Sequence, residues 1–360
     1  MTYFFEYLVF LAEVATIVLA IVVVISVSYG FSARAQHDGR RGRLKVRKLN
    51  DRLRDLRHEM EATLLPPDTV KKRHKAEAKA EQQAQKSHAL ALKQTPPETA
   101  ESDAAAGADT QTAPRRVFVL RFNGDVRASA VELLRTEVSA VLTMATSQDE
   151  VVVTVESPGG MVHAYGFAAA QLTRIRNKAI PLTVAVDHVA ASGGYLMAAV
   201  ANRIIASPFA LLGSIGVVAQ VPNVHRLLKK NDVDVEILTA GKHKRTLTVL
   251  GENTEEGREK FKEELEDVHL LFQEFVAEYR PQLDMAEVAT GEAWYGKRAL
   301  DHKLVDEIAT SDEYLLDACA DSEVFEVVWE EQKRPIERLL GQVEGLAERA
   351  RALTAWLPQR

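Results

Sequence analysis

Residues 181–200 read "PLTVAVDHVAASGGYLMAAV", and this stretch decides the fold class. Its first half is an apolar, β-branched run, which is typical of a buried strand, and its second half has the composition of a helix. Ser192 and a Gly-Gly pair stand at the junction. The junction is either a tight turn with a serine cap or a turn that exposes a hydroxyl at the end of a strand.

The same alternation continues on both sides of this stretch. Short β-branched runs are separated by segments with helical apolar spacing, and this alternation favours an α/β fold with a buried, largely parallel sheet. The predicted strands span 117–124, 151–157, 181–190, 203–207, 213–221 and 234–240, and the predicted helices span 128–145, 164–179 and 254–279.

Composition limits the class of protein. The 360 residues are 46% hydrophobic and 27% charged, so the chain is long enough for one or two domains with a substantial core. The net charge of -6 gives no sign of a nucleic-acid partner. The single cysteine, Cys319, excludes an internal disulfide and leaves both a reducing and an oxidising compartment open.

The N-terminal region predicts a single-pass membrane anchor. Residues 14–33 carry no charge, and 20 residues of helix span roughly 30 Å of hydrocarbon. A cleaved signal peptide is disfavoured, because acidic Glu6 and Glu13 precede this run and no Lys or Arg does. Residues 34–57 hold ten Lys or Arg and three Asp, so the positive-inside rule places the rest of the chain in the cytoplasm. The alternative is a periplasmic body, because large domains translocate despite their charges.

Five segments follow from these patterns. The stretch after the basic region is rich in Ala, Gln, Lys and Glu and then in Thr, Asp and Pro; its first half is compatible with a polar helix. The segments are a membrane anchor (1–33), a basic juxtamembrane segment (34–70), a low-complexity tether (71–115), an α/β body (116–320) and a C-terminal strand with an amphipathic helix (321–360).

Three short stretches of the body carry candidate chemistry, and each follows a predicted strand. They are "ESPGGMV" (156–162), "ASGGY" (191–195) and "TAGKHKRTLT" (239–248). In open α/β sheets, ligands bind where strands end. The Gly159-Gly160 pair allows backbone N–H groups to point into a cleft.

A serine nucleophile needs a base. His188 lies only four residues before Ser192 in the strand that leads to it, and His163, His225 and His243 have no carboxylate partner that the sequence identifies. Histidine stays open as the base. Lysine is the better candidate, because a lysine shielded from water acts as a general base near neutral pH, and Lys242 and Lys244 are available.

Taken together, residues 187–220, the upstream "ESPGG" and the downstream "GKHK" resemble the SppA/SohB family of serine peptidases. The anchor, basic stretch and tether resemble its SohB branch. The resemblance covers about 116–310 and implies a ClpP/crotonase-like fold without a cofactor or metal. It also implies a Ser-Lys dyad. The matching positions are Ser192 (nucleophile), Lys244 (general base, with Lys242 as its rival), Gly160 and Gly193 (oxyanion hole) and Ser214, which orients the lysine amine.

The resemblance further implies partners and a location. These are a bacterial-type inner membrane, short or unfolded apolar peptides such as signal-peptide remnants as substrates, and a homo-oligomer, possibly an octamer, in which the lysine approaches the serine of a neighbouring subunit. Two other functions remain. A crotonase-like acyl-CoA enzyme explains "SPGG" but gives no reason for Ser192 or Lys244, and an inactive scaffold would only organise membrane partners.

Overall fold

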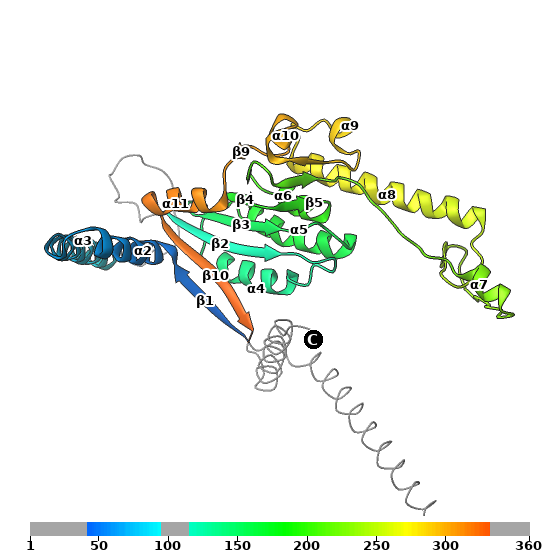
Figure 1. Ribbon diagram of the computed structural model, residues 1–360, viewed down its shortest axis with the longest axis horizontal. Coiled ribbons are helices and arrows are strands. Elements are labelled where there is room, and N and C mark those ends of the chain that lie inside the picture. The colour runs from blue at the N-terminus through cyan, green and yellow to red at the C-terminus, as the bar shows by residue number, and fades with distance from the viewer. Residues whose placement is uncertain (1–41, 95–114, 332–360) are drawn as a thin grey trace, which may run out of the picture. The chain divides into compact units, whose positions relative to one another are not determined.

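A largely parallel sheet lies at the centre of the described chain, which comprises residues 42–94 and 115–331 of a computed structural model (Figure 1). Residues 46–328 form one compact unit, and the remaining described residues belong to a second. The strands are β1 (Gly42–Lys48), β2 (Arg116–Asn123), β3 (Glu150–Glu156), β4 (Leu182–Val186), β5 (Val189–Ala191), β6 (Arg203–Ala206), β7 (Leu211–Gly213), β8 (Ala293–Tyr295), β9 (Glu307–Ile308) and β10 (Glu323–Glu331). The helices are α2 (Leu49–Leu64), α3 (Pro67–Gln94), α4 (Val131–Leu142), α5 (Val162–Arg176), α6 (Gly193–Ala199), α7 (His225–Lys230), α8 (Glu255–Tyr279), α9 (Met285–Val288), α10 (Gly296–Asp301) and α11 (Ser311–Asp321).

The seven-stranded sheet has the order β1-β10-β2-β3-β4-β6-β9, and every pair from β10 to β9 is parallel. The α/β expectation is therefore confirmed. A smaller sheet, β5-β7-β8, pairs β5 with β7 in parallel and β7 with β8 in antiparallel fashion. The single parallel bridge between Ser157 and Ala190 joins the end of β3 to β5.

The two faces of the sheet are covered by different helices, as the alternation of side chains along a strand requires. On β2, Phe118, Leu120 and Phe122 join the large core cluster that includes residues of α4 and α5. Val117 and Val119 face the other way and pack with Leu315 of α11 in a smaller cluster. Helices that pack on both faces explain why the central strands are apolar almost without interruption.

The predicted strand 181–190 is two strands in different sheets. The chain bends at Asp187, whose carboxylate accepts hydrogen bonds from the Ser311 N–H at 2.8 Å and the Ser311 hydroxyl at 2.5 Å. The Asp187 carbonyl accepts a third from the Ser207 hydroxyl at 2.6 Å. These bonds direct the chain from β4 into β5. The apolar runs on both sides of Asp187 and His188 made the segment look like one strand.

Two predicted strands, 213–221 and 234–240, are wrong. Gly213 and Ser214 have φ values of 92° and 52°, which end β7 and turn the chain out of the sheet. Residues 234–240 form no strand, because β-branched residues need a neighbouring strand for their hydrogen bonds and none adjoins them in the described part of the chain.

The helix predictions are confirmed with shifted ends. The helices α4 and α5 occupy the segments predicted at 128–145 and 164–179, and α8 occupies the one predicted at 254–279. Thr254 caps α8 by accepting a hydrogen bond from the Gly257 N–H at 3.1 Å.

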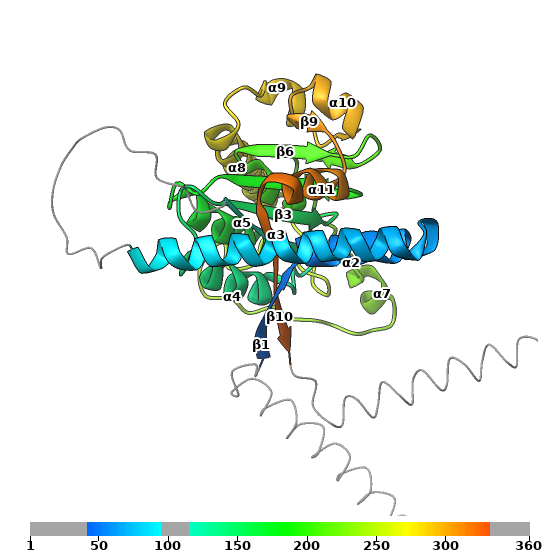
Figure 2. The ribbon, with the colours of Figure 1, turned by 90° about the vertical axis from the view of Figure 1, so that its left-hand side faces the viewer.

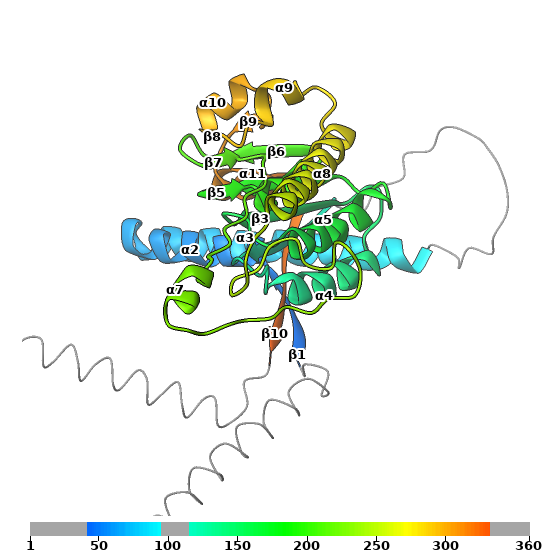
Figure 3. The same ribbon diagram turned by 90° about the vertical axis from the view of Figure 1, so that its right-hand side faces the viewer.

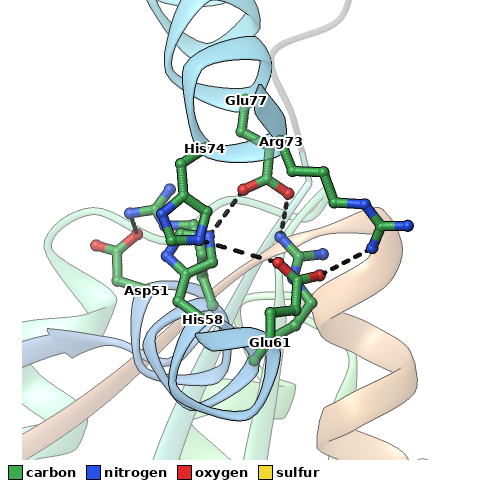
Figure 4. Close-up of polar contacts among 8 residues, drawn as sticks. Asp51, His58, Glu61, Arg73, His74 and Glu77 are labelled. Atoms are coloured by element: carbon green, nitrogen blue, oxygen red, sulfur yellow. Dashed lines mark hydrogen bonds and ion pairs between the residues drawn. The ribbon is translucent and has the colours of Figure 1, made fainter. Parts of the chain in front are cut away.

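The helices α2 and α3 lie side by side as a hairpin (Figure 2). Their contact is polar: His58 pairs with Glu77 at 2.8 Å, Arg73 pairs with Glu61 at 3.3 Å, and the rings of His58 and His74 lie 3.9 Å apart (Figure 4). The hydrogen bond from His58 lowers the pKa of Glu77 despite an opposing effect of burial. The start of the expected tether is thus a helix held by charged and aromatic contacts.

No helix within residues 42–94 and 115–331 combines the length and apolar composition that a membrane span requires. The predicted span at residues 14–33 lies outside the described residues, as do most of the second half of the tether and the C-terminal amphipathic segment.

Candidate active site

Ser192 stands between β5 and α6 in a conformation that few residues adopt. Its φ and ψ are 51° and -119°, and it is the N-cap of α6. The Ser192 N–H donates to the Gly213 carbonyl at 2.8 Å, and its carbonyl accepts from the Leu196 N–H at 2.9 Å. A non-glycine residue in this region costs about 1–3 kcal/mol, and such strain clusters at functional sites. In the described part of the chain the Ser192 hydroxyl has no hydrogen-bond partner, so it is available to a ligand.

The Gly159-Gly160 loop packs directly against this serine. Gly159 has a φ of 89°, and a Cβ there would lie 2.8 Å from Ser192 Cβ and 2.7 Å from the Gly193 nitrogen. Gly160 is pressed against the backbone of Val126, where a Cβ would lie 2.7 Å from Val126 Cα. Both positions require glycine, because no side chain fits between the loop and its neighbours.

Two backbone donors lie beside Ser192. Gly193 is the first residue of α6, so its N–H has no acceptor within the helix. The Gly160 N–H has no backbone acceptor among the described residues, whereas the Gly159 N–H is bonded to the Ser157 hydroxyl at 3.1 Å. The structure thus brings Ser192, Gly160 and Gly193 together, in an arrangement suited to hold a developing oxyanion.

Ser214 lies next to Ser192 because their strands are paired. Ala191 of β5 is opposite Gly213 of β7, so the residue that follows each strand is a serine with a positive φ. The Ser214 N–H donates to the Glu292 carbonyl at 2.6 Å, which fixes the turn that follows β7.

Lys244 lies on a different part of the molecule. We call residues 216–254, which connect β7 to α8 and include α7, the arm. In Figures 1 and 3, α7 lies apart from both sheets, on the side of the N-terminal end of α8. Lys244 belongs to the arm and is exposed, and its N–H donates to the Gly241 carbonyl at 3.2 Å. Its rival Lys242 is paired with Glu256 at 3.2 Å. Among the described residues, no hydrogen bond joins either lysine to Ser192.

The four candidate histidines do not complete the site either. His163, His188 and His243 are exposed, His225 is half-buried, and no described hydrogen bond joins any of them to Ser192. The described residues also contain no cluster of three or more His, Cys, Asp or Glu side chains arranged to hold a metal ion.

Comparison with known proteins identifies the family. Residues 2–172 match the family described as "Peptidase family S49 N-terminal", and residues 174–324 match "Peptidase family S49". A relative from Haemophilus influenzae, "Probable protease SohB", is 47% identical over 94% of this chain and 92% of its own length. The chain belongs to peptidase family S49.

Two further matches are also to proteases. A "Probable protease SohB" from Buchnera aphidicola subsp. Schlechtendalia chinensis is 56% identical over 56% of this chain and 66% of its own length. Among solved structures, a mutant of the "1510-N membrane-bound stomatin-specific protease" is similar over 57% of this chain and 85% of that one, at 12% identity and a TM-score of 0.39. The S49 membership assigns the chain to the proteases.

Sequence reasoning missed two residues that lie beneath the candidate site. Ser157 and Tyr165 are fully buried and hydrogen-bonded to each other. A tyrosine on the apolar face of a helix looks like core, and a serine before a proline looks like a turn. The only signal in the sequence was that Ser157 lies two residues before Gly159.

Proposed function

We propose that this S49 peptidase is a serine-type endopeptidase with Ser192 as its nucleophile and Lys244 as its general base, built on a ClpP/crotonase-like fold. The observation that carries the proposal is the strained conformation of Ser192 beside Gly159, Gly160 and Gly193. A crotonase-like acyl-CoA enzyme would need the glycine amides but would have no use for a strained serine.

In the proposed reaction, the Ser192 hydroxyl attacks the carbonyl carbon of the scissile peptide bond while the neutral Lys244 amine takes its proton. The oxyanion of the tetrahedral intermediate accepts hydrogen bonds from the Gly160 and Gly193 N–H groups, each worth about 3 kcal/mol. Lys244 then protonates the leaving amine, and an acyl-enzyme remains. Water, deprotonated by Lys244, hydrolyses the ester and restores the Ser192 hydroxyl. Ser214 would hold the lysine amine toward the nucleophile.

The arm supports a dyad formed between subunits. No residue from 216 to 250 is buried, and the arm exposes large apolar side chains: Val218, Val221, Leu227, Val233, Ile237, Leu238, Val249 and Leu250. An exposed apolar surface of this kind marks an interaction site. We infer that the arm packs on a neighbouring copy of the chain in a homo-oligomer, with an octamer as the assembly that the family resemblance implies, and delivers Lys244 to the neighbour's serine.

The N-terminal uncharged run supports a membrane-anchored enzyme, and its basic flank supports a cytoplasmic catalytic body, with a periplasmic body as the alternative. Short or unfolded apolar peptides, such as signal-peptide remnants, are the proposed substrates. A reporter fused after Arg360 tests the orientation: a cytoplasmic signal is expected, and a periplasmic signal would reverse it.

Alanine substitutions test the dyad in the full-length protein purified in detergent. Ser192→Ala and Lys244→Ala should each remove cleavage of an unstructured peptide, and Lys242→Ala, the matched control two residues away, should retain it. Turnover by purified Ser192→Ala protein would overturn the proposal. Loss in Lys242→Ala with turnover retained in Lys244→Ala would transfer the role of base to Lys242.

A mixing experiment tests whether the dyad spans two subunits. Ser192→Ala and Lys244→Ala chains, each inactive, are dissociated and reassembled together. A shared site predicts recovery of about a quarter of the wild-type activity in randomly mixed rings, because an intact serine then meets an intact lysine on the next chain. A site within one chain predicts no recovery.

A further inference from the structure

Beneath the candidate site lies a buried polar pair that the proposed reaction does not use. Ser157 follows β3 and Tyr165 belongs to the first half of α5, and both side chains are 0% exposed. The Ser157 hydroxyl and the Tyr165 hydroxyl are hydrogen-bonded to each other. A buried hydroxyl pair in an apolar core costs free energy unless every group is satisfied, so its partners are informative.

The partners define a single chain of hydrogen bonds. At one end, the Gly159 N–H donates to Ser157 Oγ at 3.1 Å; at the other end, Tyr165 Oη donates to the Asp125 carbonyl at 2.7 Å. An amide N–H can only donate and a carbonyl can only accept, and each hydroxyl has one proton. Ser157 must therefore donate to Tyr165. Burial raises the pKa of Tyr165, although the bond to Ser157 opposes this, so the phenol remains the neutral donor that the chain needs.

This chain of hydrogen bonds supports the Gly159-Gly160 loop. Because Ser157 accepts from the Gly159 N–H, the peptide plane before Gly159 is fixed and the next N–H, that of Gly160, is left for a ligand. The 125–129 segment supports the same loop, since the Met161 N–H donates to the Val126 carbonyl at 2.8 Å.

Ser157 and Tyr165 also pack against the first residues of α6. A Cβ on Gly193 would lie 2.7 Å from Tyr165 Cβ and 2.8 Å from Tyr165 Cδ1, so the backbone of Gly193 rests on the tyrosine. A Cβ on Gly194 would lie 2.5 Å from the Ser157 carbonyl oxygen. The Ser157–Tyr165 pair thus contacts one candidate oxyanion donor, Gly193, directly, and it holds Gly159, the residue before the other candidate donor, Gly160.

We propose that Tyr165 is a positioning residue of the peptidase site, which acts through Ser157 on the Gly159-Gly160 loop and through its ring on Gly193. The inference rests on the proposed function, because it assigns Tyr165 to the geometry of that oxyanion hole. Without the phenol, Ser157 loses its acceptor and its hydroxyl is free to rotate away from the Gly159 N–H. The oxyanion forms only in the transition state, so misplaced donors lower kcat and leave KM almost unchanged.

Tyr165→Phe in the full-length protein tests the proposal, with Tyr195→Phe as a matched control. Tyr195 is equally buried, and its hydroxyl likewise donates to a backbone carbonyl, that of Leu304 at 2.9 Å. Both variants should lower the melting temperature to a similar extent. Only Tyr165→Phe should lower kcat, by about tenfold with KM changed less than about twofold, which is part of the effect of losing one oxyanion donor outright.

An inhibitor comparison separates positioning from a general loss of structure. A peptide aldehyde forms a hemiacetal oxyanion on the serine, so Tyr165→Phe should weaken its binding by about tenfold, while a cleavage-product peptide binds as before. Ser157→Ala should reproduce the effect. The double variant should bind the aldehyde little more weakly than either single variant, because both residues belong to the same chain of hydrogen bonds.

Three results would overturn the inference: an unchanged kcat in both Tyr165→Phe and Ser157→Ala, an equal loss of kcat in Tyr195→Phe, or equal weakening of the aldehyde and the product peptide. Ser192→Ala is measured alongside. If Ser192→Ala is inactive while Tyr165→Phe is normal, only the role of Tyr165 fails. If Ser192→Ala is active, the proposed function itself fails.

Discussion

The region around Ser192 and the arm that carries Lys244 differ in how their own chain supports them. Ser157, Gly193 and Gly194 are buried, and their neighbours approach so closely that no added carbon fits at either glycine. From residue 216 to residue 250 no side chain is buried. The described part of one chain therefore fixes the proposed nucleophile and oxyanion donors, whereas the proposed base lies on a segment that buries no side chain there between residues 216 and 250.

Substitution of Gly193 should have the largest effect on activity and stability. In Gly193→Ala the new methyl group would overlap the buried Tyr165 side chain, so we expect loss of peptidase activity and about 3 kcal/mol less stability. Urea unfolding and peptide cleavage measure both effects. The control is Gly166→Ala in α5, where a Cβ meets nothing within 4 Å. This substitution should raise the free energy of unfolding by roughly 0.5 kcal/mol. Equal stability of the two variants would contradict the proposed close packing.

A polar substitution in the arm should disrupt the assembly of subunits and leave the folding of a single chain almost unchanged. Leu238 is 89% exposed in the single chain, so Leu238→Ser should change the unfolding free energy of one chain by less than about 0.5 kcal/mol. If the arm packs on a neighbour, the variant should dissociate and lose activity by about tenfold or more. Light scattering with cleavage assays measures this. An intact, fully active oligomer would show that Leu238 takes no part in the interface.

Acid should lower the stability of the fold, because it protonates Asp149. Burial alone would raise the pKa of Asp149, but hydrogen bonds from Arg116 and Thr146 outweigh it and hold the pKa below the ordinary value of 3.8. A lowered folded-state pKa stabilises the fold above the unfolded value, and this contribution is lost as the pH falls through the folded value. Stability should therefore fall as the pH drops below about 4. In urea unfolding, Asp149→Asn should show a shallower drop; parallel pH profiles would remove Asp149 from this role.

The smallest effect is expected for the exposed ion pair of the arm. The side chains of Lys242 and Glu256 lie 3.2 Å apart but are 74% and 72% exposed, so Lys242→Ala should change stability by less than about 0.5 kcal/mol. Urea unfolding at low and high salt measures it. A loss above about 1 kcal/mol would mean that the arm is folded more firmly than its exposure indicates.

Much of the fold follows from local patterns. The strands β2 and β3 and the helices α4, α5 and α8 were predicted at nearly their observed places, because each buries a regularly spaced apolar face. The errors occur where composition and pairing disagree. Residues 234–240 have the composition of a strand without a neighbour to pair with, and the bend at Asp187 depends on hydrogen bonds from Ser311, which is remote in sequence.

The candidate site divides in the same way. The order of residues marks Ser192, the Gly159-Gly160 pair and the two lysines Lys242 and Lys244 as candidates, because they follow apolar runs. The resemblance to the SppA/SohB family then selects Lys244 as the base and Gly160 and Gly193 as the oxyanion hole. The Ser157–Tyr165 pair could not. Its members are ordinary residues whose importance comes only from the glycine backbones that pack on them.

By itself, the sequence determined the alternation of strands and helices, the uncharged N-terminal run and the residue types available for chemistry. Tertiary structure decided which of them meet: it placed Gly159, Gly160 and Gly193 around Ser192, put Ser214 beside it, and left Lys244 exposed on the arm in the described part of the chain. The physical reason is that periodicity and composition act over a few neighbouring residues, whereas an active site depends on contacts between segments that only the packed core brings together.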